Sequence, residues 1–291
     1  MGKITWIGTG VMGSSMARHL AAKGHAVTLY NRSPQKAEAL ARETGMKAAA
    51  SIAEAVSGSE FIFLMVGYPK DVEESFYAPG GILDSASPGA YVVDMSTSAP
   101  SLAVRLHEDG GRRGLKVLDA PVSGGDSGAR NATLAIMAGG DEEDFKAVLP
   151  LFEAMGKSIT YLGPAGFGQH AKAANQIAVA GATAAYTEAL AYAAKVGLDP
   201  HKMLGAIGGG AAGSWQLANM APRALKGDFA PGFFIKHFIK DMKIIDGEMR
   251  ERGIELPMVR TVLGLYEEMA ALGLEDDGTQ ALIKLYSRKD R

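Results

Sequence analysis

The fold of this chain is decided close to its start, where residues 4–13 have the sequence ITWIGTGVMG. The apolar run predicts a buried strand, and the three glycines after it have the spacing GxGxxG. At this spacing Gly8 can make the tight turn, Gly10 lets the backbone approach a pyrophosphate, and Gly13 lets a helix pack closely on the strand. The pyrophosphate would then lie on N–H groups at the positive end of that helix. The stretch predicts a dinucleotide-binding βαβ unit, although the glycines alone would also fit a plain turn.

The rest of the first half continues the same alternation of apolar runs and amphipathic segments. This alternation is typical of an α/β Rossmann domain with a doubly wound parallel sheet. We expect strands at 4–7, 26–30, 61–66, 91–94 and 116–118, and helices at 11–23, 34–43, 51–57, 70–76 and 99–113.

The alternation stops after the turn GPAG at 163–166. Before it, strands expected at 133–137 and 158–162 flank a helix at 141–155, and after it only helical periodicity continues, with loops at 208–210 and 229–232. We therefore expect a dinucleotide-binding Rossmann domain over residues 1–164 and an all-α C-terminal domain over 165–291. Small and apolar residues cover nearly every side of the helix at 177–194, which predicts a partner subunit and hence a homodimer or homotetramer.

Composition excludes several functions. Thirty Lys and Arg residues stand against 32 Asp and Glu, without a basic block, so nucleic acid is not an expected partner. The chain has no cysteine and its six histidines lack ligand spacing, so we expect no metal. The N-terminus lacks the pattern of a signal peptide, and the stretch 177–194 is interrupted by polar side chains, so we expect a cytoplasmic protein that does not bind a membrane.

The end of the second expected strand indicates the cofactor. An acidic residue there would bind the ribose 2′-hydroxyl of NAD, but this chain has Asn31, Arg32 and Ser33, with Lys36 one helical turn further. Guanidinium, hydroxyl and ammonium donors would hold a 2′-phosphate, which predicts NADP(H). Alternatively, Arg32 and Lys36 are solvated surface charges. Further residues expected to contact the cofactor lie in the first helical turn and at strand ends: Val11, Met12, Met65, Val66, Ser96 and Thr97. Ser96 and Thr97 could instead contact substrate or cap the next helix.

The first helix after the boundary contains the candidate catalytic residues. Gly168, Lys172, Asn175 and Gln176 share one stripe of this helix, at spacings of three and four. A lysine in a partly desolvated cleft releases its proton more readily, which suits Lys172 to proton exchange with an alcohol or a carbonyl. The alternative is a lysine that extends from a buried helix to solvent.

A second polar motif, DAPVSGG, covers residues 119–125 at the end of the last expected parallel strand. Ligands bind at this edge of open α/β sheets, so Ser123 and the N–H groups of Gly124 and Gly125 could hold a substrate carboxylate. The alternative is a glycine turn between strands.

Taken together, the motifs at 8–13 and 119–125, the Gly168, Lys172 and Asn175 set, and the Lys240-Asp241 pair resemble the β-hydroxyacid dehydrogenases. That family includes 3-hydroxyisobutyrate dehydrogenase, tartronate semialdehyde reductase, and glyoxylate or succinic semialdehyde reductases. The resemblance implies a Rossmann domain followed by a helical domain for substrate binding and oligomerisation.

By matching position, the resemblance implies that Lys172 is the catalytic general acid and base and that Asn175 assists it. It also implies that Ser123, Gly124, Gly125 and Gln176 bind a small carboxylate substrate and that Lys240 reaches the cofactor. Residues 209–214 and 221–222 look most like the tartronate semialdehyde group, whereas residues 31–33 look like the NADPH-using reductases. Alternatives are a non-catalytic NADP-binding module and enzymes like 6-phosphogluconate dehydrogenase or imine reductase.

Overall fold

The computed structural model describes residues 2–288. The chain forms two compact units, Met1–Lys172 and Ala173–Arg291. The first unit contains all the strands within the described residues, and the second is helical. The α/β class with a helical C-terminal part is thereby confirmed, while the expected boundary after residue 164 stays a prediction.

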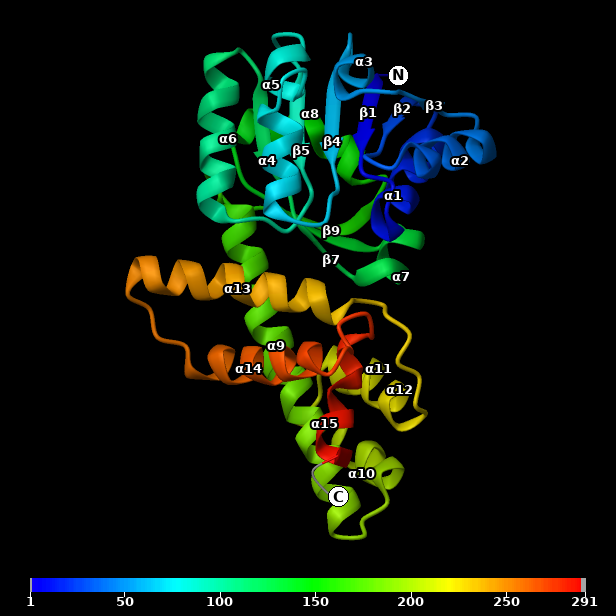
Figure 1. Ribbon diagram of the computed structural model, residues 1–291, viewed down its shortest axis with the longest axis vertical. Helices are drawn as coiled ribbons and strands as arrows, with labels where there is room; N and C mark the ends of the chain where they lie inside the picture. Colours follow the sequence, from blue (N-terminus) through cyan, green and yellow to red (C-terminus); the bar gives the residue numbers. More distant parts are fainter. Residues whose placement is uncertain (1, 289–291) are drawn as a thin grey trace. The chain divides into compact units, whose positions relative to one another are not determined.

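The main sheet of the first unit is parallel throughout, with the order β3-β2-β1-β4-β5-β6. This is the doubly wound order, in which the order of the strands across the sheet reverses between β1 and β4. Ligands bind there, at the carboxyl ends of the strands. Figure 1 shows β1, β4 and β5 side by side. The strands are β1 (Lys3–Ile7), β2 (Ala26–Tyr30), β3 (Lys47–Ala48), β4 (Phe61–Leu64), β5 (Tyr91–Asp94) and β6 (Lys116–Asp119).

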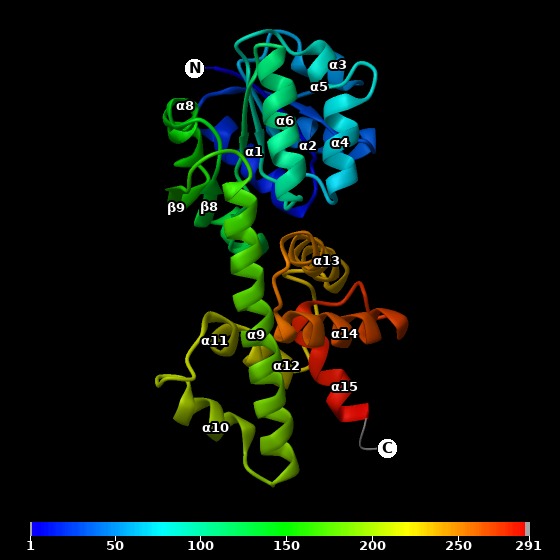
Figure 2. The same cartoon turned by 90° about the vertical axis from the view of Figure 1, so that its left-hand side faces the viewer.

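Both faces of this sheet are covered because its apolar residues alternate in direction along each strand. Trp6 and Phe63 pack in one core with residues of α1, α2 and α8, whereas Ile7 and Ile62 pack in a second core with residues of α3 to α6. Figure 2 shows α4 and α6 together on one side and α8 on the other. The helices are α1 (Val11–Ala22), α2 (Pro34–Thr44), α3 (Ile52–Val56), α4 (Pro69–Tyr77), α5 (Ile82–Ser85), α6 (Pro100–Arg112) and α8 (Glu142–Phe152).

A small second sheet completes the first unit, with the order β7-β8-β9. The expected strand pair and its helix are confirmed as β8 (Leu134–Ala138), β9 (Gly156–Tyr161) and α8. The sequence did not predict the elements within and after the 119–125 motif: β7 (Val122–Ser123) pairs antiparallel with β8, and α7 (Gly125–Arg130) follows it. A two-residue strand depends on its partner for its hydrogen bonds and has too little sequence for a pattern.

The second unit is built on the long helix α9 (Phe167–Lys195), which begins in the first unit and continues past residue 173. Figure 1 shows α13 and α14 as an antiparallel pair that crosses α9. Phe238, Met242, Val262 and Tyr266 of that pair share a buried core with Ala180 of α9. The other elements are α10 (Pro200–Ile207), α11 (Trp215–Asn219), α12 (Ala221–Leu225), α13 (Ile235–Arg252), α14 (Pro257–Ala271), η1 (Thr279–Leu282) and α15 (Ile283–Arg288).

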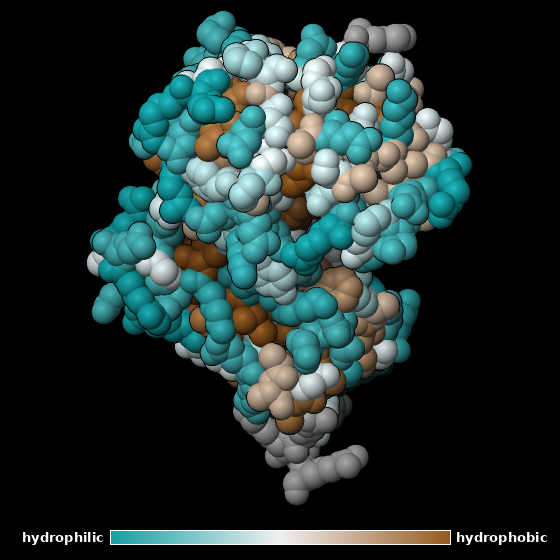
Figure 3. Space-filling model, turned by 45° about the horizontal axis from the view of Figure 1, so that its top comes forward, coloured by the Kyte–Doolittle hydropathy of each residue, from teal (hydrophilic) through white to brown (hydrophobic). Residues whose placement is uncertain are grey.

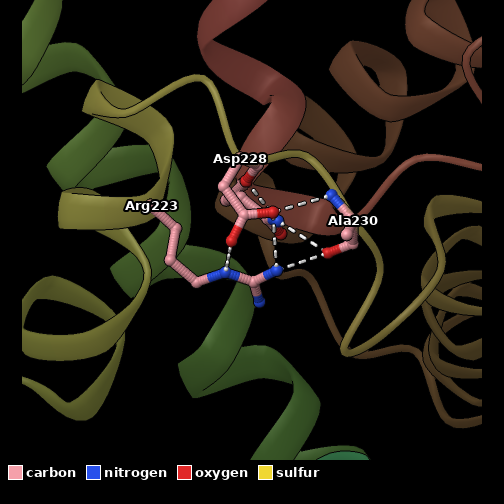
Figure 4. A network of polar contacts seen from close by, with 4 residues as sticks. Arg223, Asp228 and Ala230 are labelled. Carbon is pink, nitrogen blue, oxygen red and sulfur yellow. Dashed lines mark hydrogen bonds and ion pairs between the residues drawn. The ribbon is translucent and has the colours of Figure 1, made fainter.

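The loop before α13 is held by a polar network (Figure 4). Arg223 Nε donates to Asp228 Oδ2 at 2.8 Å, and Arg223 Nη2 donates to the Ala230 carbonyl at 2.6 Å. The buried Gln280 donates to the carbonyls of Asp228 and Ala230 at 2.9 and 3.0 Å. The loop expected at 229–232 is therefore present and fixed at the start of α13, the helix that contains Lys240.

Within residues 2–288, every helix is too short or too polar to cross a membrane. Hydrophilic side chains cover most of the face shown in Figure 3, with apolar ones in patches between them.

Candidate functional site

The turn after β1 requires glycine at two of its three glycine positions. Gly8 has φ +99°, and a Cβ on it would lie 2.2 Å from the Met65 carbonyl oxygen. A Cβ on Gly13 would lie 2.1 Å from the Gly8 carbonyl oxygen, which also accepts a 2.9 Å hydrogen bond from Trp6 Nε1. At Gly10, by contrast, a Cβ would meet no atom within 4 Å. Space above Gly10 is what a close approach of a ligand to the backbone requires.

The start of α1 fits an anion. Its N-cap is Gly10, no side chain caps it, and its first turn contains no acidic residue. Val11 is 58% exposed and Met12 is half-buried. Because the first N–H groups of a helix need acceptors from outside the helix, this end suits a pyrophosphate. The residues present therefore fit a dinucleotide.

Asn31 fixes the glycine turn to the end of β2. Its Oδ1 accepts a hydrogen bond from Thr9 N at 2.9 Å, and its Nδ2 donates to the Ser33 carbonyl at 3.0 Å. The sequence predicted Asn31 as a cofactor contact, and the structure adds this link between two loops. Ser33 and Lys36 are exposed beside it.

Arg32, the next residue, is 79% exposed in its side chain and forms an ion pair with Asp71. Its Nη1 lies 2.7 Å from Asp71 Oδ1. The end of β2 has no acidic residue of its own, but α4 brings one there from a distant part of the chain. No local pattern around Arg32 could have indicated this.

The loops after β4 and β5 are joined by Ser96. Its hydroxyl accepts a 2.9 Å hydrogen bond from Val66 N, and its side chain is fully buried. Ser96 N donates to Asp94 Oδ1 at 2.9 Å. Neither Ser96 nor Thr97 caps α6, whose N-cap is Ala99. Their expected contacts with cofactor or substrate stay predictions, as do those of Met65 and Val66, which lie just beyond the end of β4 and not within it.

Asp119, at the end of β6, holds the first turn of α9. Its Oδ1 accepts from Gly166 N at 2.7 Å and its Oδ2 accepts from Gln169 N at 2.8 Å, while the side chain is 3% exposed. Burial raises the pKa of Asp119, and the two backbone hydrogen bonds oppose that rise. A Cβ on Gly168 would lie 2.7 Å from Asp119 Oδ2, so only glycine leaves room for this contact.

Gln169 extends the anchor of α9 to β5. Its Oε1 accepts from Ser98 N at 2.9 Å and its Nε2 donates to the Ser96 carbonyl at 2.8 Å. No role was predicted for Asp119 or Gln169 from the sequence. The only sign of this anchor in the sequence was an acidic residue at the end of a buried strand. Its partner Gly166 lies 47 residues later.

Lys172 lies on α9 one turn after Gln169, and it is 7% exposed. In the same unit, Ser123 is half-buried at the end of β7 and is followed by Gly124 and Gly125, whose φ angles are +132° and +62°. Two successive residues with positive φ favour glycine and turn successive N–H groups in directions that ordinary strands do not allow.

The second unit contains the remaining predicted residues. Asn175 Nδ2 donates to Gln176 Oε1 at 2.8 Å, and Gln176 Nε2 donates to Asp241 Oδ2 at 2.6 Å. Lys240 Nζ lies 2.8 Å from Asp241 Oδ1, with the lysine side chain 12% exposed. The structure thus joins these predicted residues through Asp241, which the sequence analysis treated only as part of a motif. The contact of Gln176 with substrate and the contact of Lys240 with cofactor stay predictions.

The parallel sheet with its glycine turn is a Rossmann-type nucleotide-binding unit, and comparison with known proteins agrees. Residues 3–163 match the model for the NAD-binding domain of 6-phosphogluconate dehydrogenase. Residues 166–286 match the model described as NAD-binding of NADP-dependent 3-hydroxyisobutyrate dehydrogenase.

Relatives are similar over almost the full length. An uncharacterised oxidoreductase of Bacillus subtilis is 49% identical over 97% of this chain and 98% of its own. The 2-hydroxy-3-oxopropionate reductase of Escherichia coli is 38% identical over 97% of this chain and 96% of its own. A solved 3-hydroxyisobutyrate dehydrogenase of Mycobacterium tuberculosis, with L-serine, has a TM-score of 0.90 at 30% identity and covers 98% of this chain and 99% of its own.

The chain belongs to the β-hydroxyacid dehydrogenase family. It is an oxidoreductase that uses a nicotinamide cofactor.

The glycine turn generates a paired prediction. Gly13→Ala should lower the free energy of unfolding by about 1–3 kcal/mol, because its methyl group would collide with backbone at Gly8. Gly10→Ala should leave the free energy of unfolding within about 0.5 kcal/mol of the parental value, as ordinary surface substitutions do. It should nevertheless bind NADPH and NADH at least about tenfold more weakly, which is a loss of about 1.4 kcal/mol of binding free energy.

Thermal melts and fluorescence titrations of the two cofactors measure these effects. Unchanged cofactor affinity in Gly10→Ala would show that no phosphate approaches the backbone at this position.

Proposed function

We propose that this protein is an NADP(H)-dependent reductase of small semialdehyde acids, which interconverts the aldehyde and the corresponding hydroxy acid. The observation that carries the proposal is the buried Lys172 on α9, one turn beyond the anchor made by Asp119 and Gln169. A lysine that is buried at this point of the fold is a candidate acid and base, because partial desolvation makes its ammonium release a proton more readily. The names of the relatives, a 3-hydroxyisobutyrate dehydrogenase and a 2-hydroxy-3-oxopropionate reductase, support this substrate class.

Lys172 provides the proton in the proposed mechanism. The nicotinamide, when bound, supplies or accepts the hydride at the carbonyl carbon. In the reductive direction the Lys172 ammonium gives a proton to the carbonyl oxygen as the C=O bond becomes an alcohol, and the lysine is left as a neutral amine. In oxidation the neutral amine takes the hydroxyl proton. Asn175, three residues further along α9, is proposed to assist it.

Ser123, Gly124 and Gly125 are proposed to hold the substrate carboxylate. The hydroxyl of Ser123 and the N–H groups of two glycines with positive φ offer hydrogen-bond donors to a carboxylate. Such contacts are the same before and during reaction, so they act on substrate affinity more than on turnover.

Arg32, Ser33 and Lys36 are proposed to bind the 2′-phosphate of NADP(H). All three are exposed at the end of β2 and the start of α2. A guanidinium and an ammonium there would attract the phosphate, and a charge-assisted hydrogen bond contributes about 1.5–3 kcal/mol.

The proposed activity is tested by following cofactor oxidation with glyoxylate, succinic semialdehyde, tartronate semialdehyde and methylmalonate semialdehyde. We expect at least one of them to be reduced, with kcat/KM for NADPH exceeding that for NADH by about tenfold or more, since one charge-assisted contact has that effect. Arg32→Asp should erase or reverse the preference. Equal use of the two cofactors by the parent would contradict the NADP(H) assignment, and no turnover with any of the four would contradict the substrate class.

Replacement of Lys172 tests the mechanism. Lys172→Ala should lower kcat by about 10² to 10⁴-fold, the usual effect of losing a general acid, while NADPH affinity stays near the parental value. Lys172→Arg should be nearly as inactive, because a guanidinium does not release its proton.

Lys195→Ala, at the other end of the same helix, is the matched control and should retain parental activity. Melting curves show that each variant is folded. If folded Lys172→Ala kept more than about a tenth of parental kcat, far above the range for a lost acid, Lys172 would have no part in proton transfer.

A further inference from the structure

The Arg32–Asp71 ion pair joins a loop to a helix, through residues that are 39 positions apart in the chain. Arg32 follows β2, and Asp71 lies in the first turn of α4, which follows β4. The side chain of Arg32 is 79% exposed, whereas that of Asp71 is 19% exposed. The pair therefore consists of a solvent-exposed cation and a half-buried anion.

Asp71 is held in place by its own helix. Its Oδ2 accepts a hydrogen bond from Tyr68 N at 3.1 Å, and it occupies the third position of α4, where the helix dipole favours a negative charge. Its backbone carbonyl accepts from Ser75 Oγ at 2.7 Å. The carboxylate thus stays where it is when Arg32 changes partner.

We propose that Asp71 is a specificity-determining residue of the cofactor site, which competes with the 2′-phosphate for Arg32 and repels it. The proposal rests on the NADP(H) assignment made above. A phosphate that binds to the free donors of Arg32 comes within a few ångströms of the Asp71 carboxylate, and like charges at that separation repel each other. The guanidinium cannot give all its donors to the phosphate while Nη1 stays on Asp71.

An alternative role for Asp71 would be to orient Arg32 for the phosphate. The exposure of Arg32 argues against that role, because solvent screens an ion pair between an exposed guanidinium and a carboxylate, and such pairs order a side chain weakly. The two roles predict opposite effects of removing the charge.

The experiment compares the full chain with its Asp71→Asn variant in calorimetric titrations with 2′,5′-ADP and with 5′-AMP. The amide oxygen of asparagine can still accept from Tyr68 N, so the start of α4 is kept. We expect the variant to bind 2′,5′-ADP about three- to tenfold more tightly than the parent, and 5′-AMP within about twofold. High salt should shrink the gain, since it screens the repulsion.

Glu74→Gln is the matched control. It removes the same charge from the same helix, at a residue that pairs with Lys70 and not with Arg32. We expect it to leave both affinities within about 1.5-fold of the parent. An equal gain in this control would mean that net charge, not Asp71, governs the affinity.

An unchanged or weakened affinity of Asp71→Asn for 2′,5′-ADP overturns the proposal, and weakening would establish the orienting role instead. The parent alone tests the NADP(H) assignment, through its preference for 2′,5′-ADP over 5′-AMP. If the parent shows no preference and the variant gains one, the assignment of the cofactor fails while the role of Asp71 stands.

Discussion

The hydrogen bonds of Asp119 are the constraint on which the proposed chemistry depends. One buried carboxylate at the end of β6 binds two N–H groups of the segment that starts α9, and so fixes the first turn of this helix within the first unit. A carboxylate at this position also satisfies donors that have no partner within the helix and matches the positive end of its dipole. Lys172 lies one turn further on, where a small change in the first turn would displace its side chain.

Several loops at the carboxyl edge of the sheet are tied together by short polar contacts. Asn31 joins the glycine turn to the end of β2, Ser96 joins the loops after β4 and β5, and Gln169 joins the loop after β5 to α9. In doubly wound sheets this edge is where ligands bind. Loops fixed to each other in this way keep the phosphate-binding turn, the strand ends and the start of α9 in a constant arrangement, which is what reaction between a bound cofactor and a substrate requires.

The sequence was enough to predict what depends on local pattern. Apolar runs predicted β1, β2, β4, β5 and β6 but not the two-residue strand β3, and the GxGxxG spacing placed the turn at Gly8 and Gly13, where steric contacts explain the glycines. It was not enough for features that depend on residues distant in the chain. The strand Val122–Ser123 exists through its pairing with β8, and Asp71 reaches Arg32 from another helix. Asp119 appeared in a motif, but its partners lie 47 and 50 residues later, and no spacing rule connects them.

Amide hydrogen exchange at Gly166 and Gln169, followed by NMR on the intact chain, tests most directly whether Asp119 anchors the helix of Lys172. If the carboxylate holds both N–H groups, these two amides should exchange as slowly as those in the buried strands β1 and β4, by global unfolding. Asp119→Asn, which replaces one acceptor with a donor, should speed the exchange of these two amides. The amides of β1 should keep the same ranking of exchange rates among themselves. Fast exchange of both amides in the parent protein would contradict the account, because the first turn of α9 would then open on its own.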